Sequence, residues 1–173
     1  MSETALVGLG SNLGSPLATL REARRDLAEL GTVTRASALY RTAPVGGPAG
    51  QNDYLNAVIA LEPSPAFGEP LELLRALLEI EGRHGRLRRI RWAARTLDLD
   101  LLAFGQRIVD EPGLTLPHPR LARRAFVLAP LCEVAPQWRH PLGGESACEL
   151  LAEVDMTGVT RTDLDWSGGG ESG

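Results

Sequence analysis

Two carboxylates separated by a single leucine stand in the segment RTLDLDLLAFG, residues 95–105. If this segment is a strand, Asp98 and Asp100 point to one face and the leucines beside them point to the other. Their Cα atoms then lie about 6.5–7 Å apart. Carboxylates this close repel unless a cation lies between them, and Mg²⁺ binds one or two carboxylates together with substrate phosphates. The pair therefore predicts a divalent-cation site, with the solvated face of an edge strand as the alternative.

An arginine cluster comes directly before these acids. The segment 83–95 holds Arg83, Arg86, Arg88, Arg89, Arg91 and Arg95. All 18 basic residues of the chain are arginines, which excludes chemistry that needs a lysine, such as a P-loop clamp or a Schiff base. Guanidinium groups bind phosphate bidentately and stay charged. A solvated charge run is the plain alternative, but the adjacency of cluster and acid pair favours a polyphosphate–Mg²⁺ site, with Gly82 and Gly85 letting the loop close.

Two aromatic residues and an amide could bind a planar heterocycle. Tyr54 begins a predicted strand after a Gly/Pro-rich loop, and Phe126 follows two arginines. Asn56 shares a strand face with Tyr54 and offers both a donor and an acceptor. A ligand ring stacked between the two aromatic rings is one interpretation. Ordinary core packing is the alternative, above all for Phe126. His118 stands between two prolines, which hold its ring in a fixed place for a site role or a structural one.

The elements that must position these residues follow from apolar spacing and chain breaks. Strands are predicted over 5–9, 33–41, 54–61 and 96–104, and helices over 69–81, over 120–132 and from Pro16 to a stop at Gly31. The GLGSNLG segment after the first strand has the wrong spacing for a dinucleotide motif, and it predicts a tight turn whose backbone approaches a ligand. This order predicts an α+β, ferredoxin-like αβα sandwich with a mainly antiparallel four-stranded core sheet plus an additional C-terminal helix. One sheet face would carry helices and the other would be free for ligands.

Length and composition set the remaining bounds. The 173 residues predict one domain over 1–166 with a flexible tail over 167–173. A net charge of −4 disfavours a general nucleic-acid binder. Cys132 and Cys148 form no CxxC pair, so both are expected to be free, buried thiols in a reduced cytoplasmic compartment. The apolar run at residues 5–9 is too short for a signal peptide or a membrane span.

Taken together, the motifs resemble a known family, the 6-hydroxymethyl-7,8-dihydropterin pyrophosphokinases of folate biosynthesis. The resemblance covers residues 5–136 and rests on the segments GLGSNLGS, YRTAPVGG, QNDYLNAV, RTLDLDLLAFG and LPHPRLARRAFVLAPL. It implies a ferredoxin-like fold and transfer of pyrophosphate from ATP to the hydroxymethyl group of the pterin, with release of AMP. It also implies two Mg²⁺ ions as cofactors.

The resemblance implies a role for each matching residue. The catalytic group is Arg86, Arg95, Asp98 and Asp100, of which Asp98 and Asp100 hold the metal ions. The pterin would contact Thr42, Pro44, Val45, Tyr54, Asn56 and Phe126, stacked between the two aromatic rings. ATP would contact Glu81, Arg86, Arg88, Leu101, His118 and Arg124. Ala93-Ala94 stands where the family commonly has Gly-Pro, which should change the stiffness of this loop.

Three other functions compete with this interpretation. The first among them is a regulatory small-molecule-binding domain, which would not need Asp98 and Asp100 together. An RNA-binding module would need alternating aromatics on a central strand, and residues 54–61 offer only Tyr54. An NAD-linked oxidoreductase is weakened by the glycine spacing. We expect a monomeric cytoplasmic enzyme that binds ATP and a reduced pterin, with neither nucleic acid nor membrane as a partner.

Overall fold

The computed structural model describes residues 3–12, 15–43, 53–85 and 97–167. The strands are β1 (Ala5–Ser11), β2 (Gly31–Ala36), β3 (Tyr40–Thr42), β4 (Tyr54–Pro63), β5 (Asp98–Phe104), β6 (Val109–Glu111), β7 (Leu114–Leu116) and β8 (Val159–Arg161). The α-helices are α1 (Pro16–Ala28), α2 (Pro70–Gly85), α3 (Ala125–Val134) and α4 (Ala147–Leu151). Two short 3₁₀ turns, η1 (Pro65–Phe67) and η2 (Leu121–Arg123), precede α2 and α3.

The main sheet is antiparallel and has the strand order that a ferredoxin-like fold requires. It runs β5-β1-β4-β3-β8, and β2 also pairs with β4. The first residues of the long strand β4 pair with β3, and its last residues pair with β2. The predicted fold class is therefore confirmed, with β8 added to the expected sheet and a separate β6–β7 hairpin beside it.

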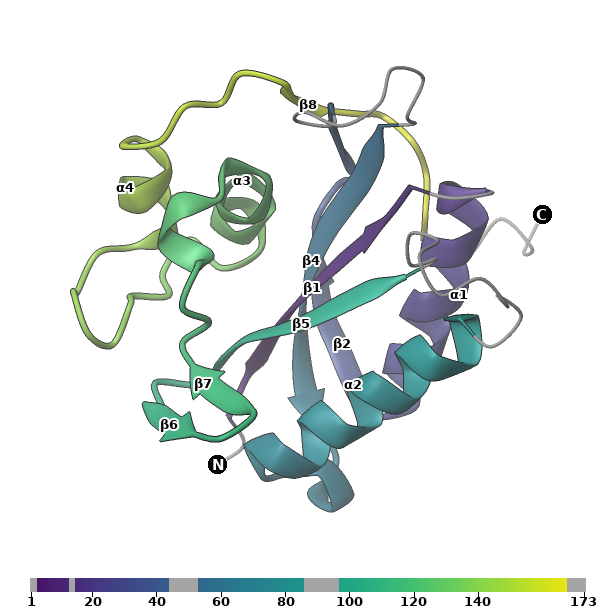
Figure 1. The fold of residues 1–173 in the computed structure, drawn as a ribbon, viewed down its shortest axis with the longest axis vertical. Coiled ribbons are helices and arrows are strands. Elements are labelled where there is room, and N and C mark those ends of the chain that lie inside the picture. The colour runs from purple at the N-terminus through teal and green to yellow at the C-terminus, as the bar shows by residue number, and fades with distance from the viewer. Residues whose placement is uncertain (1–2, 13–14, 44–52, 86–96, 168–173) are drawn as a thin grey trace.

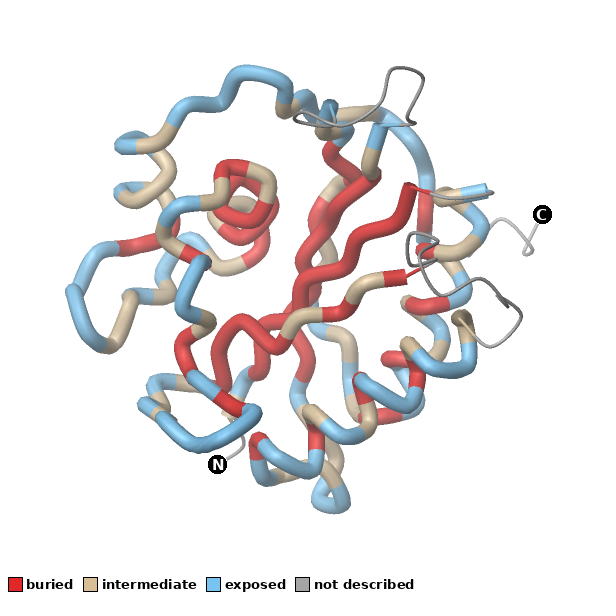
Figure 2. Tube along the Cα trace, in the orientation of Figure 1, coloured by how far each residue is buried: buried red, intermediate tan, exposed pale blue. Residues whose placement is uncertain are grey.

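Helices cover both faces of this sheet (Figure 1). Apolar residues at helical spacing on α1 (Leu20, Ala23, Leu27) and on α2 (Leu73, Leu77, Ile80) are buried against one face. On the other face, α3 buries Val127, Leu128 and Leu131 against Leu6, Val58 and Leu102. Strands β1, β4 and β5, which lie between the two layers, are mostly buried (Figure 2). The expectation that this second face is free of helices is wrong, because α3 covers part of it and α4 packs on α3.

The predicted strand over 33–41 is divided into β2 and β3, and the reason is Ser37. This residue is 2% exposed. Its backbone N–H donates to the carbonyl of Val58, and its hydroxyl accepts the N–H of Val58 at 3.0 Å. A side chain thus takes the place of a ladder hydrogen bond, and the chain bends before Tyr40.

The predicted helix over 120–132 is also divided. Arg124 has the extended backbone angles φ −110° and ψ 105°, so η2 ends before it and α3 begins after it. The helix predicted over 69–81 instead runs one turn further, to Gly85, and α1 ends at Ala28 before reaching Gly31. The expected loop over 44–51, most of the basic segment 82–94 and nearly all of the tail 167–173 lie outside the described residues.

The two cysteines form a disulfide that joins α3 to α4. The expectation of two free thiols is therefore wrong. Cys132 and Cys148 are 16 positions apart in the sequence, a spacing that carries no recognisable pattern. The packing of α4 on α3 brings their Cα atoms to 4.9 Å. Tertiary structure alone creates this pair.

The C-terminal segment crosses the edge of the sheet and ends against α1 (Figure 1). Strand β8 pairs with β3, and the following residues reach Trp166, which is 4% exposed. The indole N–H of Trp166 donates to the carbonyl of Ser37, and the guanidinium of Arg24 lies over its ring. No helix among the described residues combines the length and the apolar character needed to cross a membrane.

Candidate active site

A pocket of about 530 Å³ opens on the face of the sheet that α3 covers. Its lining residues come from β1, β3, β4, β5, the end of α2 and the start of α3. They are Gly8, Leu9, Gly10, Thr42, Ala43, Tyr54, Asn56, Ala57, Glu81, Asp98, Asp100, Arg124, Phe126 and Val127. Segments distant in the sequence therefore bring most of the predicted site residues that the structure describes to one place.

The two acids of β5 face this pocket. Asp98 and Asp100 are half-buried and line it, whereas Leu99 points to the opposite face and is buried in the core. The alternation expected of a strand is thus present. In the order of the sheet β5 is an edge strand, as the alternative interpretation required. Its carboxylates nevertheless face the pocket, where a cation and its ligands could reach both.

Glycines of β1 form the floor between the acids and the amide. Gly10 lies directly between Asn56 on β4 and Asp98 on β5, and Gly8 lies beside Asp100. A Cβ atom at Gly10 would come within 2.8 Å of Asn56 Oδ1. The predicted strand ended at residue 9 and left Gly10 in a turn, but the strand continues to Ser11 and includes both glycines. Glycines two residues apart in a strand share a face, and this spacing was the signal that could have identified the floor.

The amide side of the pocket is held in one orientation. Asn56 is 8% exposed, and its Nδ2 donates to Thr42 Oγ1 at 2.8 Å. Thr42 lies opposite Tyr54 across the β3–β4 ladder, so the three side chains share one face of the sheet. Because the threonine accepts from the amide nitrogen, the amide oxygen points the other way and lies above Gly10, beside the pocket.

Glu81 of α2 forms a hydrogen bond with β5, the strand that carries Asp98 and Asp100. The carboxylate lines the pocket, and its Oε2 accepts the backbone N–H of Leu99 at 2.6 Å. This bond fixes the beginning of β5 against the last turn of α2. The position of both aspartates therefore depends on α2 as well as on their own strand.

Arg124 and Phe126 line the pocket from the start of α3. The extended backbone at Arg124 places it at the start of α3, and its guanidinium carbon lies 5.6 Å from the centre of the Phe126 ring. A permanent cation and an aromatic face thus stand beside each other in the pocket that the acids also line.

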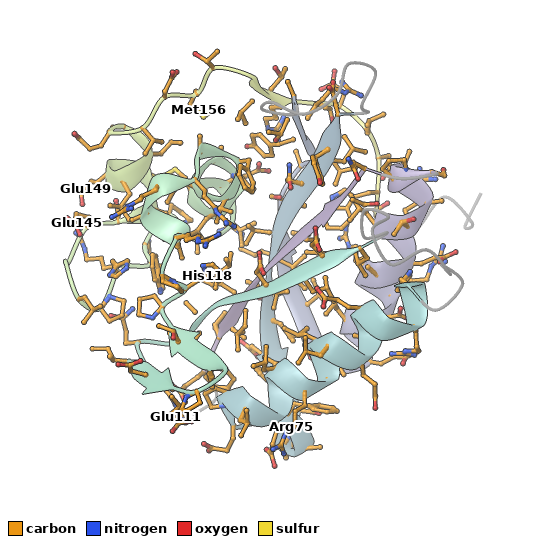
Figure 3. All side chains as sticks on the ribbon, viewed as in Figure 1. Arg75, Glu111, His118, Glu145, Glu149 and Met156 are labelled. Carbon is orange, nitrogen blue, oxygen red and sulfur yellow. A yellow bond between two sulfur atoms is a disulfide. The ribbon has the colours of Figure 1, made fainter. Side chains whose placement is uncertain are left out.

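His118 lies on the segment that joins β7 to α3 (Figure 3). Its Nδ1 accepts the backbone N–H of Arg120, which assigns the ring proton of the neutral form to Nε2. Burial lowers the pKa of His118, the Asp100 carboxylate opposes that shift, and the charges of Arg124 and Arg120 add to it. Its imidazole is outside the pocket lining but interacts electrostatically with two of the lining residues.

Some predicted residues are not brought into this pocket. The side chain of Leu101 packs in the core on the other face of β5 and is 4% exposed, so only its backbone remains for a contact with ATP. Pro44, Val45, Arg86, Arg88 and Arg95 lie outside the described residues.

Comparison with known proteins identifies the family. The family model described as 7,8-dihydro-6-hydroxymethylpterin-pyrophosphokinase matches residues 6–136. A 2-amino-4-hydroxy-6-hydroxymethyldihydropteridine pyrophosphokinase from Pseudomonas aeruginosa is 43% identical over 164 residues, covering 93% of this chain and 98% of its own. Another protein of that name, from Synechocystis, is 43% identical over 157 residues, covering 90% of this chain and 78% of its own.

Solved structures add evidence on the fold. The crystal structure of wild-type Plasmodium falciparum HPPK-DHPS with SDX-DHP superposes with a TM-score of 0.68 at 14% identity. The match covers 88% of this chain, which spans 44% of the length of that one. At such low identity the similarity supports only the αβα architecture.

The family and the activity expected from the sequence are confirmed by these relatives. The fold and the matched sequence agree. The chain belongs to the 6-hydroxymethyl-7,8-dihydropterin pyrophosphokinase family, whose members transfer pyrophosphate from ATP to their pterin substrate in folate biosynthesis.

Proposed function

We propose that the pocket between β4, β5 and α3 is the active site, with the pterin on its β4 side and the ATP phosphates on its β5 side. One observation carries this assignment: Asn56, Gly10 and Asp98 lie in one row across three adjacent strands. The row places an oriented amide and a carboxylate on the two sides of a floor without side chains. A flat ring and a phosphate chain could therefore meet over Gly10.

On the pterin side we assign Thr42, Tyr54, Asn56 and Phe126, together with Pro44 and Val45 of the neighbouring segment. Asn56 is already oriented by Thr42 at 2.8 Å, so binding a ring would not require it to reorganise. The rings of Tyr54 and Phe126 line the same pocket and could stack on a planar heterocycle.

On the ATP side we assign Asp98 and Asp100 to two Mg²⁺ ions. Their chemistry fits this cation, because Mg²⁺ uses one or two carboxylates and completes its shell with phosphate oxygens and water. Among the described residues no group of three or more His, Cys, Asp or Glu side chains could form an all-protein cage. A pair of carboxylates open to a substrate is therefore the suitable arrangement. When bound there, the ions supply charge neutralisation to the triphosphate.

The remaining assignments concern the phosphate chain. Arg124 offers a permanent positive charge in the pocket, His118 a neutral donor at Nε2, and Glu81 fixes β5. In the transfer the hydroxymethyl oxygen bonds to the β-phosphorus, the bond from that phosphorus to the oxygen bridging it to the α-phosphate breaks, AMP leaves and the hydroxyl proton passes to solvent. Arg86, Arg88, Arg95 and the backbone of Leu101 complete this side of the proposal.

Substitution of the acids tests the assignment. Asp98→Ala and Asp100→Ala should each reduce Mg²⁺-dependent release of AMP by at least about a hundredfold, as expected when a group stabilising transition-state charge is lost. Their thermal unfolding should remain close to that of the unchanged protein. Asp110→Ala, at an exposed position of β6, is the matched control and should retain full activity. Near-normal kcat in either pocket variant would refute the metal assignment.

We also propose that a single domain over residues 1–166 holds the whole site and acts as a monomer in the cytoplasm. Gel filtration at working concentration should give a mass near 18.6 kDa. A dimer at activity-assay concentrations would contradict the monomer.

A further inference from the structure

The carboxylate of Glu133, near the end of α3, accepts hydrogen bonds from three segments that are separate in the sequence. Its Oε1 accepts from the hydroxyl of Tyr40 at 2.8 Å. Its Oε2 accepts from the backbone N–H of Ala38 at 3.0 Å and from Nη2 of Arg161 at 3.2 Å. The donors belong to the turn before β3, to β3 and to β8. One side chain therefore joins α3 to the edge of the sheet.

The protonation states of Glu133 and Tyr40 at neutral pH favour these hydrogen bonds. Burial would raise the pKa of Glu133, but the hydrogen bonds from Tyr40, Arg161 and Ala38 outweigh it and bring the pKa below its usual value. Burial and the bond to Glu133 raise the pKa of Tyr40 to about 12. At neutral pH the carboxylate is charged and the phenol keeps its proton, so the bond between them is charge-assisted.

Glu133 is connected to both walls of the pocket through rigid elements. On α3 it lies seven residues after Phe126, a spacing that places the two on one helix face. On β3 its partner Tyr40 lies two residues before Thr42, on the same face of the strand. Thr42 in turn holds the Asn56 amide. The Glu133–Tyr40 bond thus joins the helix that carries Phe126 to the strand that carries Thr42.

We propose that Glu133 is a positioning residue for the pterin side of the pocket, which sets the spacing between Phe126 and the Thr42–Asn56 pair. This inference rests on the proposed placement of the pterin. The acids on β5 are held by α2 and by β1 instead, so the metal-binding part of the phosphate side does not depend on Glu133. Arg124, also assigned to the phosphate side, precedes α3 in extended backbone and does not lie within the helix. Loss of the carboxylate should therefore weaken the pterin site more than the ATP site.

The conservative variant makes a sharp comparison possible. In Glu133→Ala the Ala38 N–H, the Tyr40 hydroxyl and Arg161 all lose their acceptor. In Glu133→Gln the amide oxygen can take the place of Oε2, and the amide nitrogen can donate to the Tyr40 oxygen, because a hydroxyl both donates and accepts. Glutamine should therefore restore the connection without the charge.

Steady-state kinetics with each substrate varied in turn test the proposal. Glu133→Ala should raise KM for the pterin about tenfold, the size of one lost hydrogen bond to a charged group, and leave KM for ATP within about twofold. Glu133→Gln should return the pterin KM to within about threefold of the original. The control is Glu149→Ala on α4 (Figure 3), which removes the capping box at Ser146 and should lower Tm without changing either KM.

Three results would overturn the proposal: an unchanged pterin KM in Glu133→Ala, an equal rise in both KM values, or no recovery with glutamine. If Glu133→Ala fails to fold, Tyr40→Phe supplies the same test by removing only one donor, and an unchanged pterin KM there also overturns it. Equilibrium titration with the pterin separates this inference from the site assignment. Weaker binding in Asn56→Ala with normal binding in Glu133→Ala refutes only the role of Glu133, whereas normal binding in Asn56→Ala refutes the site.

Discussion

At the scale of single residues, the pocket depends on the absence of a side chain at Gly10 as much as on the polar groups around it. The amide of Asn56 and the carboxylate of Asp98 flank this glycine, and the amide oxygen occupies the space that a Cβ atom would need. In the proposed site, the absence of a side chain at Gly10 would let a flat substrate approach the sheet.

Gly10→Ala should therefore weaken pterin binding without unfolding the protein. The new methyl group would lie 2.8 Å from Asn56 Oδ1, and the amide would have to turn away from Thr42 to relieve the contact. We expect a rise of about tenfold in the pterin Kd, equal to about 1.4 kcal/mol, with a smaller effect on the free energy of unfolding. Gly68→Ala, beside α2, is the control and should bind normally. Unaltered pterin binding by Gly10→Ala would contradict the proposed position of the ring.

The alternation of residues 97–101 was predictable because a strand with a period of two needs no tertiary information. The leucines fill the core and the two aspartates face the pocket, as expected. Glu133 was not predictable in this way. Its three donors come from residues 38, 40 and 161, and only the folded chain brings them together.

At the scale of elements, the predicted boundaries of strands and helices are wrong where a side-chain hydrogen bond or tertiary packing interrupts the element. Strand 33–41 breaks because the hydroxyl of Ser37 bonds to β4, a contact that local propensity does not contain. The helix over 120–132 breaks at Arg124, and this break brings Arg124 and Phe126 together at the pocket. The disulfide between α3 and α4 likewise follows from packing and has no local signature.

Reduction of this disulfide should destabilise the α3–α4 layer. A crosslink closing a loop of about 15 residues contributes about 3 kcal/mol by restricting the unfolded chain. Denaturant unfolding with and without a thiol reductant should show a loss up to about this size. The Cys132→Ala/Cys148→Ala double variant should be insensitive to the reductant. If the unchanged protein were equally insensitive, its cysteines would be free thiols in solution.

At the scale of the whole molecule, the pocket forms where strands from both sides of β1 meet the end of α2 and the start of α3. The side proposed for the pterin lies on β3, β4 and the start of α3, and the side proposed for the phosphates lies on β5 and α2, with β1 between them. The C-terminal segment contacts β3 through β8 and α1 through Trp166, and the backbone N–H of Ala43 donates to the carbonyl of Gly158. The C-terminal segment therefore supports β3, on the side of the pocket that is proposed for the pterin.

The central claim is that Asp98 and Asp100 hold cations against the phosphate chain of ATP. Crystals grown with Mn²⁺ in place of Mg²⁺ and a non-hydrolysable ATP analogue would test it directly, because anomalous scattering locates the manganese ions. We predict two anomalous peaks beside these carboxylates, each also touching phosphate oxygens. Carboxylates bound only to water, with the manganese elsewhere or absent, would contradict the account.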